Sequence, residues 1–255
     1  MKKDLECHKI SFMSTVEQAR TPAVEDYCKA IFTLESRAGE PVSTNALAER
    51  LEITPGSVSA MLKKLGELEF ITHLPYRGVR LTDEGRRVAL EVIRHHRLLE
   101  LFLAETLEMP WDRVHAEAEV LEHVISEDLE RLIAAKLGDP TLDPHGDPIP
   151  SAELELSERE TFPLDSLRAG DSGVFVRVSD ADPEMLRYLS ERGIYPGERF
   201  DVLECQPFGG PLFVLFGERE HAIGGQLAGA MRVEVDQEPE KDRARRREEL
   251  IDGRD

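Results

Sequence analysis

Acidic and imidazole side chains recur at intervals of three or four residues in the region 92–126 of the 255-residue sequence. Side chains with this spacing lie on the same face of a helix, with Cβ atoms about 5 to 6 Å apart. Carboxylate oxygens and imidazole nitrogens that converge in this way are suitable ligands for divalent ions. The residues of this pattern are His96 and Glu100, then His115 and Glu119, then Glu122 and His123.

The same spacing is common on solvated helix faces that bind nothing, so each pair taken alone is weak support for a metal site. Here the pairs fall on two successive predicted helices, which are joined by Met109, Pro110 and Trp111. We therefore consider both divalent-ion binding and a structural network of charged side chains.

Composition restricts the class of protein. Hydrophobic residues make up 40% of the chain, enough to build the cores of one large domain or several small ones. No apolar run reaches the roughly 18 residues of a membrane span, and the N-terminus lacks the apolar stretch of a signal peptide, so we expect a cytoplasmic protein with no membrane partner. Cys7, Cys28 and Cys205 form no CxxC motif, so neither a disulfide framework nor a thiolate zinc site is indicated.

The formal charge of −19 is unevenly distributed along the chain. Acidic residues are in excess in the region 91–160, whereas the region 54–82 is locally basic. The basic residues of the region 54–82 are Lys63, Lys64, Arg77 and Arg80. This distribution is compatible with polyanion binding by the N-terminal part and cation binding by the middle part.

Helical periodicity begins at Thr21, the expected N-cap, continues through Pro22 in the first turn and ends at Gly39. Asp26 lies near the start of this helix. Cys28, two residues later, points to roughly the opposite side, and we expect it in the core.

A helix that begins at Ser43 or Thr44, a tight turn, and a second helix that begins at Thr54 form the helix-turn-helix pattern. The residues 70–85 then alternate in polarity around Gly78, as in a β-hairpin with a basic tip. Together these elements predict a winged-helix DNA-binding domain, although a small α/β unit of another kind has a similar pattern. The residues expected to contact double-stranded DNA are Thr44, Thr54, Ser57, Ser59, Lys63, Lys64, Tyr76 and Arg77.

A long helix is predicted from Thr82 to about Leu107. Its second half, through Leu98, Leu99 and Leu101, is apolar on more than one side, which leaves apolar area for a partner subunit and favours a homodimer. Two further helices are predicted between 112 and 138. A region rich in proline and acid follows, and beyond it short alternating strands with glycine turns predict a small β-barrel.

This order of elements resembles the diphtheria toxin repressor family of metal-dependent transcriptional repressors. The resemblance covers residues 21–236, and its most specific pieces are VEDYCKAIFTLE, HHRLLELFL and VHAEAEVLEHVIS. It implies a multidomain α+β fold. The expected parts are a disordered extension (1–20), a winged helix-turn-helix domain (21–86), an all-α metal-binding and dimerisation domain (87–140), a linker (141–160), an SH3-like, FeoA-type β-barrel (161–236) and a disordered charged tail (237–255).

Carried over by position, the resemblance implies two metal sites. The primary site falls on Asp26, Glu119, Glu122 and His123. The second site falls on His96, Glu100 and His115, completed from the barrel by Asp180 ahead of Asp182 and Glu184. Iron-sensing members are similar but have methionine in place of Asp26 and cysteine in place of Glu119. The two carboxylates make a harder site that suits Mn²⁺, with Fe²⁺ as the alternative and Co²⁺ or Zn²⁺ able to bind in vitro.

Five other positions bear on the sites. The small two-domain manganese repressors carry a glutamate where this chain has Lys29, so a two-manganese cluster built on that position is not implied. His95 is expected at the surface or in an interface, because it points about 100° away from His96. His73, His145 and His221 have no acidic or imidazole neighbours at helical spacing.

We therefore expect a Mn²⁺-dependent repressor of metal-homeostasis genes, in which the metal orders a homodimer for operator binding. It is not expected to be an enzyme or to bind a small organic substrate. The alternatives are an Fe²⁺-responsive repressor, and a winged-helix regulator with a structural acidic network and a non-metal signal. A metal-dependent hydrolase is a rival of another class, although no nucleophile or acid–base pair can be traced in the sequence.

Overall fold

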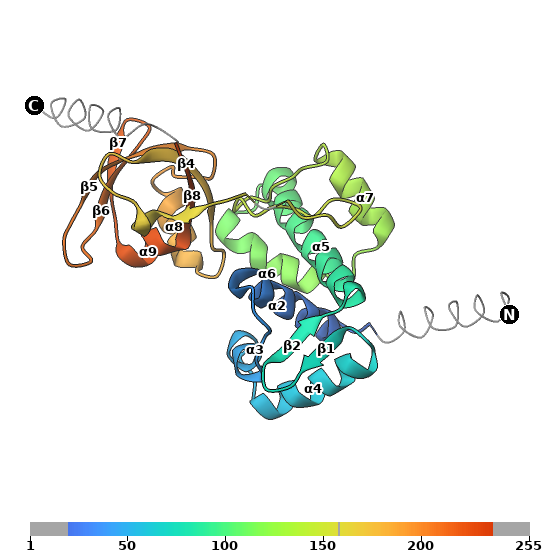
Figure 1. Cartoon of the computed structure of the whole chain (residues 1–255). Helices are drawn as coiled ribbons and strands as arrows, with labels where there is room; N and C mark the ends of the chain where they lie inside the picture. The colour runs from blue at the N-terminus through green and yellow to red at the C-terminus, as the bar shows by residue number, and fades with distance from the viewer. Residues whose placement is uncertain (1–19, 158, 237–255) are drawn as a thin grey trace, which may run out of the picture. The chain divides into compact units, whose positions relative to one another are not determined.

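The computed structural model describes residues 20–157 and 159–236 (Figure 1). Residues 1–19 of the predicted extension and the predicted tail 237–255 lie outside the described residues. The helices are α2 (Pro22–Ala38), α3 (Thr44–Arg50), α4 (Pro55–Glu67), α5 (Asp83–Leu107), α6 (Trp111–Leu121), α7 (Glu127–Lys136), α8 (Pro183–Ser190), α9 (Gly225–Ala230) and the 3-10 turn η1 (Leu164–Ser166). The strands are β1 (Ile71–Leu74), β2 (Gly78–Leu81), β3 (Phe162–Pro163), β4 (Ser172–Val178), β5 (Arg199–Cys205), β6 (Leu212–Phe216), β7 (Arg219–Ile223) and β8 (Met231–Val235).

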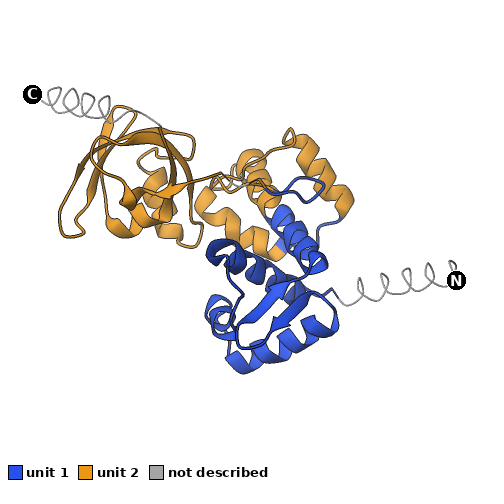
Figure 2. Cartoon of the chain, viewed as in Figure 1, with its two compact units in different colours: residues 1–96, 121–126, 150–156 blue, residues 97–120, 127–149, 157–255 orange. Residues whose placement is uncertain are grey.

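The chain divides into two compact units (Figure 2). The first unit comprises residues 1–96, 121–126 and 150–156, and the second comprises residues 97–120, 127–149 and 157–255. The boundary crosses helix α5 after His96, so this helix contributes residues to both units.

Helix α2 of the first unit begins and ends where the sequence predicts. Pro22 occupies its first turn, and Gly39 ends it with a φ of 69° while its N–H donates to the Glu35 carbonyl at 2.8 Å. Thr21 precedes the helix in an extended conformation, but its side chain makes no capping hydrogen bond. Cys28 is fully buried, as predicted, and burial raises the pKa of its thiol to about 12.

Helices α3 and α4 form the predicted helix-turn-helix. Ser43 Oγ accepts a hydrogen bond from the Ala46 N–H at 3.1 Å, and Thr54 Oγ1 accepts one from the Ser57 N–H at 3.3 Å. Each helix therefore starts at a hydroxyl N-cap, which satisfies a backbone donor that the helix itself leaves unpaired.

The wing is the antiparallel pair of β1 and β2. Val42 adds a short bridge on the outer side of β2, where it exchanges two hydrogen bonds of 2.9 Å with Val79. Gly78 has a φ of 114°, and a Cβ at this position would lie 2.2 Å from the Val42 carbonyl oxygen. Only glycine fits here, which explains the glycine at the end of the hairpin turn.

One apolar core connects these elements. Ile31 of α2, Leu47 of α3 and Leu65 of α4 are fully buried together with Phe70. Because α2 shares this core with α3 and α4, a change in the position of α2 also changes the positions of those two helices.

Helix α5 runs from a cap at Thr82, whose Oγ1 accepts from the Gly85 N–H at 3.1 Å, to Leu107 as predicted. In the second unit its Leu98, Leu99 and Leu101 are buried within the chain. The prediction that these residues provide apolar area for a partner subunit is therefore wrong. The large apolar side chains exposed in this unit include Leu107, Val120, Leu129 and Leu132.

The C-terminal part of the second unit is an antiparallel sheet of six strands in the order β3-β8-β4-β5-β6-β7. Its core contains the fully buried Phe175 and Phe200. Trp111, the first residue of α6, joins this core and donates its indole N–H to the Leu186 carbonyl at 3.1 Å. The sheet is thereby attached to the helices of the same unit.

The proline-rich segment that we predicted as a linker is folded. In the second unit Leu142 bridges to Pro148, and the Ile149 N–H donates to the Thr141 carbonyl at 2.9 Å. In the first unit Leu154 packs against the apolar core. No helix among the described residues combines the length and apolar character that crossing a bilayer requires.

Candidate metal centre

The first donor set lies in the first unit, where α2 meets the segment 121–126. Asp26 comes from the first half of α2, and Glu122 and His123 directly follow α6. His123 Nε2 lies 2.9 Å from Asp26 Oδ1 and 3.5 Å from Glu122 Oε1. One donor atom from each of the three residues falls within 4.8 Å of the others, which is the separation that a shared cation requires.

The imidazole of His123 is held from both sides. Its Nδ1 lies 2.7 Å from Glu25 Oε2, on the opposite edge of the ring from Asp26. Glu25 also pairs with Arg20 at 3.4 Å. A carboxylate on one ring nitrogen fixes the orientation of the other, which is the usual support for a metal-binding histidine.

Glu122 is the most enclosed member of this set, with its side chain fully buried. Its carboxylate lies 2.9 and 2.8 Å from Lys29 Nζ and 2.5 Å from His96 Nδ1. Burial alone would raise the pKa of Glu122, but the hydrogen bond from His96 and the charge of Lys29 reverse this and lower it. Glu122 is therefore an ionised acceptor in the protein interior.

The donor set fits a hard or borderline divalent ion. It offers carboxylate oxygens and an imidazole nitrogen. The thiol of Cys28, two residues after Asp26, is instead buried in the apolar core. Such donors suit Mn²⁺, Fe²⁺ or Zn²⁺ rather than ions that require thiolate ligands.

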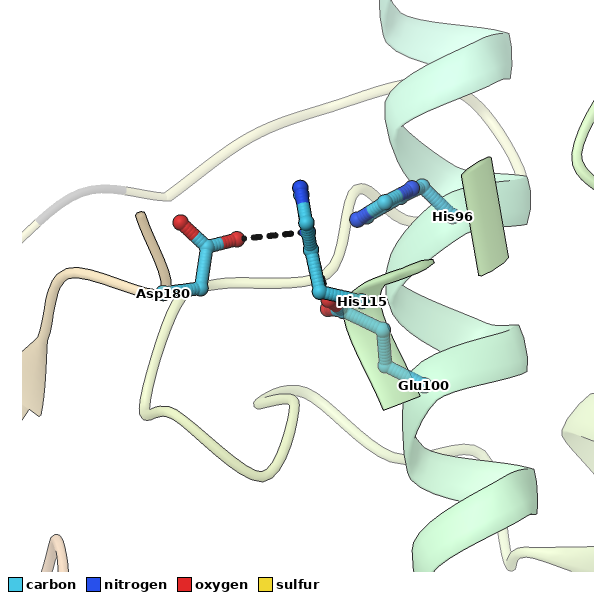
Figure 3. A group of neighbouring side chains, drawn as sticks. All are labelled: His96, Glu100, His115 and Asp180. Carbon is cyan, nitrogen blue, oxygen red and sulfur yellow. Dashed lines mark hydrogen bonds and ion pairs between the residues drawn. The ribbon is translucent and has the colours of Figure 1, made fainter. Parts of the chain in front are cut away.

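The second donor set lies in the second unit (Figure 3). His115 of α6 points its Nδ1 at Asp180 Oδ2, 3.0 Å away, and at Glu100 Oε1, 3.2 Å away. Asp180 follows strand β4, and Glu100 comes from α5. His96, also drawn in Figure 3, precedes Glu100 by one turn on α5.

Electrostatics in the second set favour a protonated imidazole. Hydrogen bonds to Asp180 and Glu100 raise the pKa of His115 to about 10. Burial alone would raise the pKa of Asp180, but the hydrogen bond from His115 lowers it to about 2. A divalent ion that uses His115 must therefore displace a proton.

His145 is a functional candidate that sequence reasoning missed. Its ring is fully buried, with Nε2 2.9 Å from the Trp111 carbonyl and Nδ1 3.8 Å from Glu100 Oε2. Asp143 Oδ1 shapes this loop by accepting from the His145 and Asp147 N–H groups at 2.8 and 2.9 Å. The sequence shows no acidic neighbour of His145 at helical spacing, but the fold brings Glu100 of α5 and Asp143 of its own loop close to it.

Two predicted ligands also make contacts outside the sets to which they were assigned. Glu119 is exposed, with 43% of its side chain accessible, and lies 3.9 Å from His115 Nε2. His96 precedes Glu100 by one turn of α5, as expected for the second set, and its Nδ1 lies 2.5 Å from Glu122 Oε2. Asp182 caps helix α8 by accepting from the Glu184 N–H at 2.9 Å, which makes it a structural residue.

His95 was expected at the surface or in an interface, and it is not at the surface of the chain. It is buried, and its Nδ1 lies 3.1 Å from the Glu122 carbonyl oxygen. The residues from Val92 to His96 are all buried, so α5 has no solvent face here and the direction of His95 relative to His96 could not reveal exposure.

The predicted DNA-contacting residues occupy the helix-turn-helix and the wing. Ser57, Ser59, Lys63 and Lys64 are exposed on α4. Thr54 caps that helix, whereas Thr44 is the half-buried first residue of α3. Tyr76 is fully exposed at the tip of the hairpin, and Arg77 beside it pairs with Glu40 at 2.9 Å.

Three protein-family models match successive parts of the chain. They are the iron dependent repressor N-terminal DNA binding domain over residues 20–79, the iron dependent repressor metal binding and dimerisation domain over residues 82–151, and the FeoA domain over residues 162–235. The matched ranges contain the helix-turn-helix, most of the candidate ligands and the C-terminal sheet, respectively.

Known proteins are similar along nearly their whole length. The iron-dependent repressor IdeR of Mycobacterium tuberculosis is 32% identical over 222 residues, which covers 82% of this chain and 96% of that protein. The diphtheria toxin repressor of Corynebacterium efficiens is 32% identical, with 82% and 94% covered.

Among solved structures, a manganese-dependent transcriptional repressor in complex with manganese is 42% identical, with a TM-score of 0.76 and 82% of this chain and 98% of that chain covered. The manganese regulator SloR is 30% identical, with a TM-score of 0.68 and 85% and 100% covered. With its DNA-binding, metal-binding and FeoA parts all matched, the chain belongs to the diphtheria toxin repressor family and is a metal-dependent, DNA-binding transcriptional repressor.

Proposed function

We propose that this repressor senses Mn²⁺ and binds operator DNA as a homodimer when the ion is bound. The observation that carries the proposal is the first donor set, in which oxygen and nitrogen atoms of Asp26, Glu122 and His123 converge without sulfur. The proposed ligands are Asp26, Glu119, Glu122 and His123 for the primary ion, and His96, Glu100, His115 and Asp180 for a second ion.

Fe²⁺ is the second candidate ion. Relatives that are 32% identical are named as iron-dependent repressors, whereas a 42% identical structure is named as manganese-dependent. Co²⁺ and Zn²⁺ are also expected to bind in vitro, because Zn²⁺ and Co²⁺ generally exceed Mn²⁺ in affinity for such ligands.

The residues of the first set convert ion binding into a change at the DNA-reading helices. When bound, the ion supplies positive charge that offsets the carboxylates of Asp26 and Glu122. Asp26 then ties α2 to the segment that carries Glu122 and His123. Because α2 shares its apolar core with α3 and α4, fixing α2 also fixes the helix-turn-helix.

The DNA-binding surface is proposed to be α4 with the wing. Ser57 and Ser59 lie toward the N-terminal end of α4, which enters the major groove in helix-turn-helix proteins, while Lys63 and Lys64 lie farther along, suited to phosphates. The Ser59 hydroxyl donates to the Pro55 carbonyl at 2.9 Å, so it reads DNA only as an acceptor or after rotation. Tyr76 and Arg77 are proposed to contact the neighbouring backbone.

Self-association is proposed to use the exposed apolar side chains at the end of α5 and on α6 and α7. Val120 and Leu132 have 70% and 65% of their surface accessible in the single chain, which is unfavourable for large apolar residues unless a partner covers them. Leu132→Glu is expected to give a monomer in sedimentation velocity.

The function is tested by fluorescence anisotropy with duplexes selected from a random-sequence library in the presence of Mn²⁺. Saturating Mn²⁺ is expected to tighten DNA binding by about 100-fold, near the upper end of usual allosteric coupling. Asp26→Asn should abolish the increase. Glu191→Gln, the same carboxylate-to-amide change at an exposed residue that ends α8, should leave it intact.

Equal DNA affinity with and without Mn²⁺ or Fe²⁺ in the wild-type protein would contradict the proposal. A response to anaerobic Fe²⁺ at concentrations where Mn²⁺ has no effect would instead favour the iron-sensing alternative.

A further inference from the structure

Lys29 places an ammonium group inside the first donor set. It lies on α2, three residues after Asp26, so both side chains extend from the same face of the helix. Its Nζ is 2.9 Å from Glu122 Oε1, 2.8 Å from Glu122 Oε2 and 3.3 Å from His96 Nδ1. Only 19% of the side chain is accessible, so the charge is largely shielded from water.

Both carboxylate oxygens of Glu122 are thus engaged by a positive charge that belongs to the chain. The carboxylate is fully buried, and burying an anion is unfavourable unless a cation or hydrogen-bond donors compensate it. Lys29 supplies that compensation through its contacts with both oxygens of Glu122. His123 Nε2 lies 3.5 Å from Glu122 Oε1 and 2.9 Å from Asp26 Oδ1.

A divalent ion that takes an oxygen of Glu122 must therefore share or displace the ammonium group. The two cations repel each other, and the repulsion is weakly screened because water has little access. Lys29 Nζ also lies 3.3 Å from Nδ1 of His96, which itself contacts Glu122.

We propose that Lys29 is an internal cation that competes with the divalent ion for Glu122 and so sets the metal concentration at which the repressor responds. This inference rests on the proposed function, because it requires Glu122 to be a metal ligand. Lys29 then has two effects of opposite sign, because its charge stabilises the metal-free protein but weakens the binding of the metal ion.

The test is calorimetric titration with Mn²⁺ alone, in a His115→Ala background that disables the second donor set. Lys29→Met is expected to lower the dissociation constant by at least about tenfold, because even partial screening leaves a +1 and a +2 charge a few ångströms apart strongly repulsive. Lys29→Arg keeps the charge and should remain within about threefold of the parent. Lys136→Met removes the same charge at an exposed position of α7 and should have no effect.

Thermal unfolding provides a second measurement. Lys29→Met should lower the Tm of the metal-free protein and show a larger Mn²⁺-induced rise in Tm than the parent, because the lost ion pair is replaced by a more tightly bound ion. If Lys29 had only a structural role, Lys29→Met would lower the Tm of the metal-free and the Mn²⁺-bound protein by the same amount and leave the dissociation constant for Mn²⁺ unchanged.

The outcomes separate the two proposals. If the parent protein binds no Mn²⁺, the proposed function fails. If the parent binds Mn²⁺ and Lys29→Met binds it equally or more weakly while folded, only the role of Lys29 fails. If Lys29→Met does not fold without metal, Lys29→Gln is used in its place. An affinity of Lys29→Arg for Mn²⁺ far tighter than that of the parent would also overturn the proposed competition by Lys29.

Discussion

The two donor sets contain the same kinds of ligand but differ in the positive charge that balances their carboxylates. In the first set the charge is the ammonium group of Lys29 on Glu122. In the second it is the proton on His115, shared between Asp180 and Glu100.

This difference predicts different controls on metal binding. In the first set the charge that competes with a metal ion belongs to the side chain at position 29, so it can be removed by substitution. The proton on His115 must leave when the nitrogen binds a metal, so binding in the second set competes with protons. We therefore expect the charge of residue 29 to control the affinity of the first set, and the proton on His115 to control that of the second.

The largest expected effect tests whether the first set binds the metal ion when the second set is disabled. Glu122→Gln, measured in a His115→Ala background, should weaken Mn²⁺ binding by more than about 100-fold, because losing a buried charged ligand costs more than losing an outer-shell partner. Calorimetry measures this, with Glu117→Gln on the exposed face of α6 as the matched control. Similar losses in both variants would show that general negative charge, not this site, attracts the ion.

The next effect is the pH dependence of the second set, measured in a Glu122→Gln background. Because the pKa of His115 is about 10 without metal, Mn²⁺ affinity should rise by about tenfold per pH unit between pH 6 and 8, with release of close to one proton. Titrations in buffers of different ionisation enthalpy count the proton. Asp180→Asn lowers the pKa of His115 toward its usual 6.5 and should flatten the upper part of this dependence.

The ion pair of His115 with Asp180 also makes the stability of the metal-free protein depend on pH. A raised pKa of His115 means that its stabilisation is fully present below about pH 6.5 and is lost as the pH rises through about 10. The lowered pKa of Asp180 means that its own share is present above 3.8 and is lost as the pH falls through about 2. The destabilisation caused by Asp180→Asn should thus be greatest between these limits, in denaturation measured across pH.

The smallest expected effect concerns His145, whose Nδ1 lies 3.8 Å from Glu100 Oε2. His145→Gln should weaken Mn²⁺ binding in the second set by up to about tenfold, as is usual for an outer-shell partner. The first set, measured in the His115→Ala background, should be unaffected. A loss in both sets would indicate that His145 supports the fold and not Glu100 in particular.

The helix starts could be predicted because they depend on residues that are close together in the sequence. The starts of α3, α4 and α5 follow from Ser43, Thr54 and Thr82, because an N-cap hydroxyl acts within a few residues. Helical spacing indicated Glu122 and His123, but combining them with Asp26 required the family resemblance, because α2 and the segment 121–126 are nearly a hundred residues apart in sequence.

The residues that sequence reasoning missed act across long separations and outside helical spacing. His145 reaches Glu100 from a loop 45 residues away, where no periodicity indicates a contact. Lys29 was noted only as a departure from a family pattern, whereas its position on Glu122 depends on how α2 packs against the segment 121–126. His95 was misassigned because direction on a helix predicts exposure only when one face is solvated.

The most direct test of the account is an anomalous difference map from crystals grown with Mn²⁺, with data collected at the manganese absorption edge. The account predicts a peak bounded by Asp26, Glu122 and His123, with the Lys29 ammonium group moved away from at least one oxygen of Glu122. Well-ordered side chains at these three positions with no peak between them, while Lys29 still engages both oxygens of Glu122, would contradict it.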